Sequence, residues 1–412
     1  MHYREAESEG LGRKARQWKA LRSLLERALE DSGEFRERLR AAGLSARDLD
    51  SPEGLAQVPP LRKKDLIRFQ EERGLDWLLT CEPGRLRRIY MSPGPIFDPE
   101  GLGPDHWGWA EAFFAAGFRA GDLVQMTFSY HLTPAGLMLE EPLREIGCCV
   151  IPAGPGNTQV QIDLMRRLPV TGFVGMASYL KTIGQKAREQ GLDPRRDFRL
   201  RTAFVAAEKL TESLRSEVQE MFGAVVRQGY GTADVGAIAY ECEEKNGMHA
   251  STRCLVEICD PATGRPLPPG ETGEVVVTAL TPEYPLVRLA TGDLSRFLTD
   301  PCPCGRTALR LDGILGRADD TAKVKGQFIY PSQAAKVMAL FPQVGAWQIV
   351  VENPGGRDEI AVQLCLTGEL DEGAFAAAFQ NEMKLRPKVR RLAAGDLAAD
   401  APKLVDRRTF GA

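Results

Sequence analysis

The chain has 412 residues and a formal net charge of −3, with 43% hydrophobic and 26% charged residues. This composition is typical of a globular protein with a sizeable core and excludes a disordered chain. The small net charge gives no electrostatic reason to expect nucleic acid or an anionic membrane as a partner, and neither is predicted. A chain of this length exceeds the usual size of a single core, so a large domain and a smaller one are expected.

The N-terminal residues contain no apolar run that could serve as a signal-peptide core, and the sequence offers no stretch of about 18 apolar residues. A cytoplasmic location is therefore expected. Nine cysteines in a reducing compartment argue against a disulfide framework and direct attention to ligand-like spacings. Four cysteines are isolated or lie in apolar stretches and are predicted to be core residues: Cys81, Cys148, Cys149 and Cys365.

The order of the predicted elements favours an α/β fold. Apolar residues at helical spacing predict a largely helical segment over 18–44. Residues 87–91 predict a strand that enters a Pro- and Gly-rich loop of the kind that holds ligands. From 105 to about 225 strands and helices alternate, which predicts a doubly wound parallel sheet with its site at the carboxyl ends of the strands. Residues 255–298 predict a β-rich region with a hairpin, and the last hundred residues predict a small α+β domain.

Three motifs carry a resemblance to a known family. They are RQGYGTADVGAIAYECEEKNGMH, PLVRLATGDL and CPCGRTALRLDGILGRADDTAKVKGQFIYPSQ. In this order and spacing they resemble the phenylacetate-CoA ligases, a branch of the acyl-adenylate-forming enzymes, and the resemblance extends over nearly the whole chain. It implies a large N-terminal adenylate-forming domain, 1–315, with doubly wound sheets and a β-rich subdomain, followed by a small mobile C-terminal α+β domain, 316–412.

The resemblance also implies which residues hold the nucleotide. The YGTAD segment would lie against adenine and Mg²⁺, with Asp234 as the metal-binding carboxylate and a catalytic position. The TGD carboxylate, Asp293, would accept hydrogen bonds from the ribose hydroxyls, and Arg317 would contact ribose or phosphate. The full set of nucleotide-side candidates is Ser92, Gly94, Glu208, Tyr230, Gly231, Thr232, Asp293 and Arg317.

Other candidates concern the acid and CoA. The segment SYHLTPAG is similar to a family stretch that borders the acyl pocket, and it contributes Tyr130, His131 and Gly136; a structural loop histidine is the alternative for His131. Asp319 would lie near the hinge. The loop that faces the pantetheine channel of CoA would include Lys323, Lys325 and Gly326.

Several positions depart from the family pattern at catalytic places. Pro93 and Pro95 remove backbone donors from the phosphate loop, and Asp98 is expected to bring a negative charge toward the phosphates. Asp234 is one methylene shorter than the usual glutamate. Near the C-terminus Asp400 aligns with the family's lysine, so that Lys403 is the candidate for that catalytic charge, with a solvated surface lysine as the alternative.

Four residues form a candidate zinc site, because thiolates and imidazole are the preferred ligands of Zn²⁺. They are Cys242, His249, Cys302 and Cys304, and some members of the resembled branch bind zinc at these places. The alternative is four unrelated residues with reduced, buried thiols. Cys254 and Cys259 are reserve ligands.

Two functions remain open from the sequence. The first is an ATP- and Mg²⁺-dependent ligase that activates a small carboxylic acid as an acyl adenylate and transfers it to CoA. The second is a catalytically degenerate accessory protein that binds a nucleotide or acyl adenylate without making it. The altered positions favour the second, and the retained TGD and GRADD segments favour a surviving nucleotide site. The resemblance alone suggests a homodimer.

Overall fold

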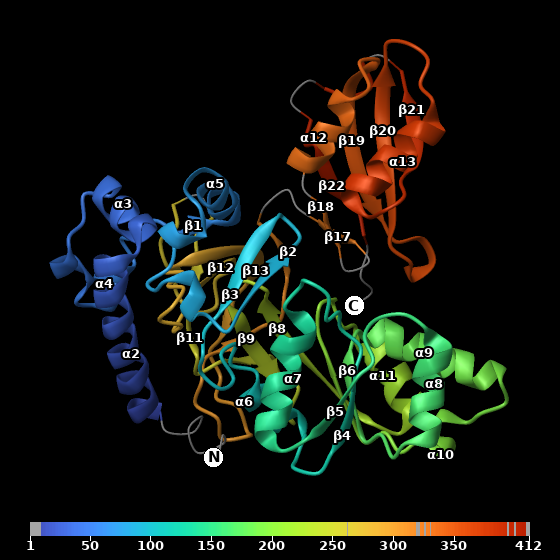
Figure 1. The fold of residues 1–412 in the computed structure, drawn as a ribbon, viewed down its shortest axis with the longest axis horizontal. Coiled ribbons are helices and arrows are strands. Elements are labelled where there is room, and N and C mark those ends of the chain that lie inside the picture. Colours follow the sequence, from blue (N-terminus) through green and yellow to red (C-terminus); the bar gives the residue numbers. More distant parts are fainter. Residues whose placement is uncertain are drawn as a thin grey trace. The chain divides into compact units, whose positions relative to one another are not determined.

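The computed structural model contains two compact units, Met1–Gly316 (unit 1) and Arg317–Ala412 (unit 2) (Figure 1). The fold class agrees with the predicted mixed α/β protein. Among the described helices none is long and apolar enough to cross a membrane. The structure describes residues 10–261, 263–318, 322–324, 327–329, 331–393, 395–398 and 401–408.

Unit 1 is built on a nine-stranded mixed sheet. Its strand order is β14-β15-β10-β9-β8-β7-β6-β4-β5, and the run from β8 to β5 is parallel. From edge to edge the strands are β14 (Phe297–Leu298), β15 (Arg310–Leu311), β10 (Met248–Ala250), β9 (Gly236–Glu241), β8 (Val225–Thr232), β7 (Thr202–Val205), β6 (Gly172–Gly175), β4 (Leu123–Met126) and β5 (Cys149–Pro152).

Helices cover both faces of the parallel strands, as predicted for a doubly wound sheet. Adjacent strand residues alternate between two hydrophobic clusters, because successive side chains point to opposite faces. Phe173 packs with α8, α9 and α11, whereas Val174 packs with α6 and α7 (Figure 1). The helices are α6 (Ala110–Ala116), α7 (Ala135–Ile146), α8 (Thr158–Arg167), α9 (Ala177–Glu189), α10 (Pro194–Asp197) and α11 (Glu212–Phe222).

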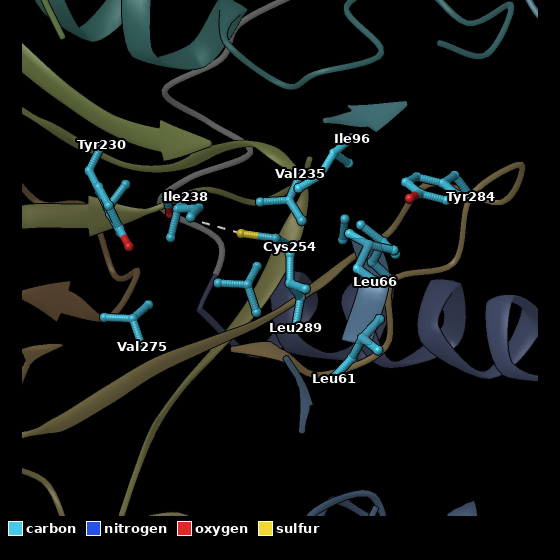
Figure 2. Close-up of a cluster of buried hydrophobic side chains, with 14 of the residues drawn as sticks. Leu61, Leu66, Ile96, Tyr230, Val235, Ile238, Cys254, Val275, Tyr284 and Leu289 are labelled. Carbon is cyan, nitrogen blue, oxygen red and sulfur yellow. Dashed lines mark hydrogen bonds between the residues drawn. The ribbon is translucent and has the colours of Figure 1, made fainter. Parts of the chain in front are cut away.

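A second sheet forms the β-rich part of unit 1 and confirms the predicted hairpin. Its order is β1-β13-β12-β11, with β11 and β12 antiparallel. Leu61, Ile96, Tyr230 and Val275 belong to the hydrophobic cluster beneath it (Figure 2). The strands are β1 (Leu61–Arg62), β11 (Cys254–Cys259), β12 (Gly273–Ala279) and β13 (Leu289–Ser295), and β16 (Gly316–Arg317) stands at the boundary between the units.

The N-terminal helices pack in a cluster of their own. The predicted helical segment over 18–44 is divided, because Ser32 caps a new helix by accepting a hydrogen bond from the Phe35 amide. Leu21 and Phe35 are buried in this cluster. The helices are α2 (Gly10–Asp31), α3 (Gly33–Ala41), α4 (Pro52–Leu55) and α5 (Lys63–Arg73).

Two expectations for unit 1 require correction. Residues after Ser92 do not continue as a loop: β2 (Arg88–Ser92) and β3 (Ile96–Glu100) pair as an antiparallel hairpin, with Ser92 opposite Ile96. A two-strand ladder satisfies the backbone groups that a loop would leave to a ligand. Of the cysteines predicted to be core residues, Cys149 is exposed on the edge strand β5 and Cys81 is only partly buried.

Unit 2 is a small α+β domain, as predicted, and contains a four-stranded sheet. The sheet order is β21-β20-β19-β22, and Phe375 and Phe379 of α13 pack on it. Its elements are β17 (Ala322–Val324), β18 (Gln327–Ile329), α12 (Pro331–Ala339), β19 (Val344–Glu352), β20 (Glu359–Leu366), α13 (Glu372–Met383), β21 (Lys388–Leu392) and β22 (Leu404–Asp406).

Candidate active site and metal centre

The loops that follow the parallel strands meet at one edge of the nine-stranded sheet. Tyr130 follows β4, Glu208 follows β7, and Tyr230 lies near the end of β8. Because all five strands run in the same direction, these loops leave the sheet at the same edge, where open α/β sheets bind their ligands. The fold therefore brings together candidates that lie in separate segments of the sequence.

Tyr230 connects the two strongest sequence motifs. Its hydroxyl donates to Asp293 Oδ2 at 2.8 Å and lies 3.2 Å from Thr291 Oγ1. The Asp293 amide donates to Thr291 Oγ1, which fixes the turn around the carboxylate. Tyr230 itself is nearly buried, and its ring belongs to the cluster beneath the second sheet (Figure 2). The YGTAD and TGD segments thus form one constellation in which Asp293 is oriented by a fixed hydroxyl.

Gly231 and Thr232 continue the same strand. A Cβ at Gly231 would lie 2.2 Å from the Gly236 carbonyl oxygen and 2.5 Å from the Trp109 ring, so no larger residue fits without rearrangement. The Thr232 hydroxyl is buried and has no hydrogen-bond partner among the described residues. It is therefore a polar atom that a ligand could satisfy.

Glu208 is held in place by the start of α9. Its carboxylate accepts hydrogen bonds from the Ser178 amide and the Ser178 hydroxyl, both at 2.7 Å. The preceding residue, Ala207, has a φ of +72°, a conformation that alanine rarely adopts. The backbone immediately before Glu208 is therefore strained, and this conformation places Glu208 beside Ser178.

Ala207→Gly is expected to raise the free energy of unfolding by about 0.5–1 kcal/mol, because relief of the left-handed strain exceeds the added flexibility of the unfolded chain. The matched variant Ala206→Gly changes a neighbour whose φ is not positive, and a loss of about 0.5–1 kcal/mol is expected. Urea unfolding of the three proteins measures both values. Equal losses in the two variants would contradict the assignment of strain to Ala207.

Asp234 lies in the turn between β8 and β9 and forms an ion pair. Its Oδ2 atom lies 2.8 Å from Lys63 Nζ, and the Asp234 side chain is 1% exposed. Asp98 of β3 is fully buried nearby, beside Ser92 and Lys63. Burial, and then the charge of Asp234, raise the pKa of Asp98 well above its ordinary value.

These contacts correct the expectation for Asp98. The side chain does not face outward, because β3 points it into the interior, where burial raises its pKa well above the ordinary value. Ser92 ends β2 and is 8% exposed, while Gly94 lies in the hairpin turn. The phosphate-loop candidates therefore lie on a hairpin whose buried face contacts the Asp234 region.

Of the three candidates for the acid pocket, two pack against each other and one is exposed. The Tyr130 hydroxyl donates to Glu140 of α7 at 2.6 Å. Gly136 lies against the Tyr130 ring. A Cβ at Gly136 would come within 2.8 Å of that ring and 2.6 Å of the Ser129 carbonyl oxygen. His131 is exposed in the same loop. Tyr130 and Gly136 are thus brought together by close packing.

The candidates in unit 2 are only partly described. Arg317 opens the unit, and Lys323 lies on β17, opposite Phe328 of β18. Lys403 lies before β22, with its Nζ atom 5.2 Å from the centre of the Trp347 ring, so it is not a fully solvated surface lysine. Four positions lie outside the described residues: Asp319, Lys325, Gly326 and Asp400.

The predicted metal ligands converge in one buried cluster. The ligand atoms of Cys242, His249, Cys302 and Cys304 all lie within 4.8 Å of one another. Cys242 Sγ is 3.7 Å from Cys302 Sγ, and Cys304 Sγ is 3.4 Å from His249 Nε2. A tetrahedral Zn²⁺ with bonds of about 2.3 Å to sulfur and 2.0 Å to nitrogen would separate such atoms by about 3.8 and 3.5 Å. A disulfide requires a sulfur separation of about 2.05 Å, which excludes that pairing here.

The electrostatics of the cluster suit a cation. Burial lowers the pKa of His249 to about 4, so the imidazole is neutral and can act as a ligand at pH 7. Burial raises the pKa of Cys242 to about 12. Burial also opposes ionisation of Cys304, but hydrogen bonds from Arg306 bring its pKa below the ordinary value. The reserve ligands lie elsewhere: the Cys254 thiol faces backbone carbonyls of β9, and Cys259 receives a hydrogen bond from Arg288.

Sequence reasoning missed two members of the site. Lys63 stands in PPLRKKDL, where a lysine pair at the start of a helix gives no sign of which side chain turns inward. Ser178 lies in the first turn of α9 and holds Glu208, yet no motif marks it. Both are recognised only through partners that are distant in sequence.

The fold and the sheet-edge site define an AMP-binding, adenylate-forming enzyme, and residues 122–280 match the AMP-binding enzyme family. The phenylacetate-coenzyme A ligase of Thermus thermophilus is 32% identical over 343 residues, which cover 80% of this chain and 76% of that protein. The phenylacetate-coenzyme A ligase of Pseudomonas putida is 31% identical over 373 residues, which cover 87% and 83%. The chain therefore belongs to the phenylacetate-CoA ligase family.

A solved structure supports the same conclusion. The crystal structure of 2-hydroxyisobutyryl-CoA ligase in complex with 2-HIB-AMP and CoA has a TM-score of 0.87 and 25% identity, covering 98% of this chain and 91% of that one. With these relatives, the chain is by class an AMP-forming carboxylate–CoA ligase, and ATP and CoA are its cosubstrates.

Proposed function

We propose that the chain activates a small carboxylic acid, aromatic acids included, at the edge of the nine-stranded sheet, with the nucleotide held beside Asp293. The observation that supports this most strongly is the 2.8 Å hydrogen bond from Tyr230 to Asp293. It orients a carboxylate, which has about four acceptor sites on its two oxygens, toward hydrogen bonds from ribose hydroxyls. The relatives that act on phenylacetate and 2-hydroxyisobutyrate support a small acid.

The chemistry consists of two displacements. A carboxylate oxygen of the acid attacks the α-phosphorus of ATP, and the bond to the leaving pyrophosphate breaks. The thiolate of CoA then attacks the acyl carbon, and the bond to AMP breaks. The chain contributes positioning and charge stabilisation, since neither step requires a covalent bond to the protein.

The remaining candidates have proposed places in this scheme. The buried Thr232 hydroxyl would form a hydrogen bond with the nucleotide. Glu208 and Gly231 would line the part of the site that holds adenine. Ser92 and Gly94 would border the phosphates, and Tyr130, His131 and Gly136 the acid. In the C-terminal domain, proposed as 316–412, the nucleotide and CoA contacts would come from Arg317, Asp319, Lys323, Lys325, Gly326 and Lys403.

Magnesium is proposed to bind as a complex with ATP. The residue that fits it is Asp234, because its Oδ1 atom is buried without a hydrogen-bond partner among the described residues. Bound Mg²⁺ would neutralise charge on the phosphate oxygens.

Zinc is proposed to bind Cys242, His249, Cys302 and Cys304 as a structural ion. The four-ligand set closes a tetrahedral site and leaves no open position for water. The site would join β10 to the loop before β15, the strand that pairs with β10 at Met248 and Leu311. The homodimer stays a prediction.

One observation favours the accessory-protein alternative. The ion pair between Lys63 and Asp234 engages the carboxylate that the adenylation reaction needs. A protein that no longer adenylates could retain such a pair unchanged. Nucleotide binding and pyrophosphate release separate the two functions, since only the ligase releases pyrophosphate when an acid is supplied.

Asp293→Ala is expected to weaken ATP binding about 10- to 100-fold, because it removes a charged acceptor from the ribose hydroxyls. Titration of the protein with ATP and Mg²⁺ by calorimetry measures the change. Asp300→Ala, an exposed aspartate just beyond β14, is the matched control and should bind ATP like the unmodified protein. Equal ATP affinity in Asp293→Ala and Asp300→Ala would contradict the proposed contact between Asp293 and the ribose. A complete absence of ATP binding in the unmodified chain would contradict the proposed ligase function.

A further inference from the structure

Three segments from different parts of the chain converge on the side chain of Asp234. Lys63 opens α5 directly after β1, Asp98 lies in the middle of β3, and Asp234 lies in the β8–β9 turn. Each is flanked by a residue of the same hydrophobic cluster, namely Leu61, Ile96 and Val235. Figure 2 shows Ile96 and Val235 as neighbours in this cluster. The charged group is therefore built into a hydrophobic wall.

The cation that contacts Asp234 in this group belongs to the chain itself. The ammonium nitrogen of Lys63 lies 2.8 Å from Asp234 Oδ2. A divalent cation placed on Asp234 with Lys63 still in position would bring two positive groups into contact in a site of low dielectric.

The Lys63 side chain can move away from Asp234. Its side chain is 15% exposed, whereas that of Asp234 is 1% exposed, so the lysine lies on the solvent side of the pair. A lysine side chain is flexible, with an ammonium that is readily hydrated. Removal of the lysine from the pair therefore costs little conformational strain, while Asp234 stays fixed in its turn.

We infer that Lys63 and Mg²⁺ compete for Asp234, so that binding of Mg²⁺ with ATP displaces the Lys63 ammonium from the carboxylate. This inference rests on the proposed role of Asp234 as the magnesium ligand. It makes Lys63 a positioning residue that sets the Mg²⁺ concentration at which the nucleotide is held. Mg²⁺ on the Oδ1 atom and the ammonium on the Oδ2 atom would share one buried carboxylate, where their mutual repulsion makes the binding of each weaken that of the other.

Calorimetric titration of ATP at a series of free Mg²⁺ concentrations tests the exchange by binding alone. Lys63→Met keeps the apolar stem and removes the competing charge, and we expect half-maximal ATP binding at a Mg²⁺ concentration at least tenfold lower. Lys64→Met is the matched control, because it removes the same charge from the exposed next residue of α5 and should leave the Mg²⁺ dependence unchanged.

A second variant covers the case in which Lys63→Met does not fold. Lys63→Arg keeps the positive charge and can pair with a carboxylate through two hydrogen bonds, so it should need at least as much Mg²⁺ as the unmodified protein. Identical Mg²⁺ dependence in Lys63→Met and Lys64→Met, or a lowered requirement in Lys63→Arg, would overturn the competition while leaving ATP binding intact. Failure of the unmodified protein to bind ATP at any Mg²⁺ concentration would instead overturn the proposed function and the inference with it.

Discussion

Arg288→Met is expected to lower the free energy of unfolding by about 3–5 kcal/mol, because it leaves the Glu257 carboxylate, which is only 19% exposed, and three carbonyl oxygens without their donor. Arg288 is fully buried and its guanidinium donates to Glu257 at 2.9 Å. It also donates to three carbonyl oxygens, those of Ala56, Val58 and Gly264, and so joins the end of α4 to the second sheet. Urea unfolding of the two proteins gives the difference.

The loss should depend on pH in a defined direction. Burial raises the pKa of Glu257, and Arg288 opposes that rise. Without Arg288 the folded-state pKa rises further above the unfolded value, so the variant loses stability as the pH rises through the folded pKa and is less affected at lower pH. Arg296→Met removes an exposed arginine that pairs with Asp312 at 2.8 Å, and a loss below about 1 kcal/mol is expected. A similar loss in both variants would contradict the role given to Arg288.

The sequence indicated that the YGTAD and TGD segments both belong to the nucleotide site. It did not indicate the geometry of the contact between them. Alternating strands and helices over 105–225 predict a sheet edge with loops, and the structure places Glu208 and Tyr230 there. The hydrogen bond from Tyr230 to Asp293 spans 63 residues and two sheets, which no local pattern encodes. Residue types could indicate the ligand-bearing segments, whereas the pairing depends on how β8 packs against β13.

Buried charges were the least predictable part of the site. Lys63 and Asp98 stand in sequences whose neighbours include charged residues or proline, which is the usual pattern of exposed residues, whereas Arg288 stands among apolar neighbours. The charges of Lys63 and Arg288 are balanced by carboxylates in remote segments, those of Asp234 and Glu257, and Asp98 is buried beside Asp234. The hairpin of β2 and β3 was missed for a related reason, since Pro93 and Pro95 are typical of a loop although they lie only in its turn.

The cluster of three cysteines and one histidine, in contrast to the buried charges, could be predicted from the sequence. Only one residue separates Cys302 from Cys304, an unusual spacing, yet ligand chemistry and the family resemblance together selected four residues that the structure brings into one cluster. Thiols and imidazole within 4.8 Å of one another are costly to bury unless a cation or protons neutralise them. A proposed zinc ion would therefore contribute to folding of the β10 and β15 region as well as to its local geometry.

Cys242→Ser is expected to reduce bound zinc from one ion per chain to near zero and to lower stability by about 4 kcal/mol when free Zn²⁺ is about 1,000 times the dissociation constant. Metal analysis by mass spectrometry and thermal unfolding with and without a chelator measure the two effects. Cys254→Ser alters a buried thiol outside the cluster and should keep one zinc per chain.

The zinc affinity should also fall as the pH is lowered, and the reason lies in which ligands carry protons. His249 has a pKa of about 4 and is already neutral, so it contributes little to the pH dependence above about pH 5. Cys242, with a pKa of about 12 before metal binds, must release a proton to the solvent, and each such thiol weakens binding about tenfold per pH unit. A metal-free unmodified protein whose unfolding is unaffected by added zinc would show instead that the four side chains pack as protonated, uncharged residues.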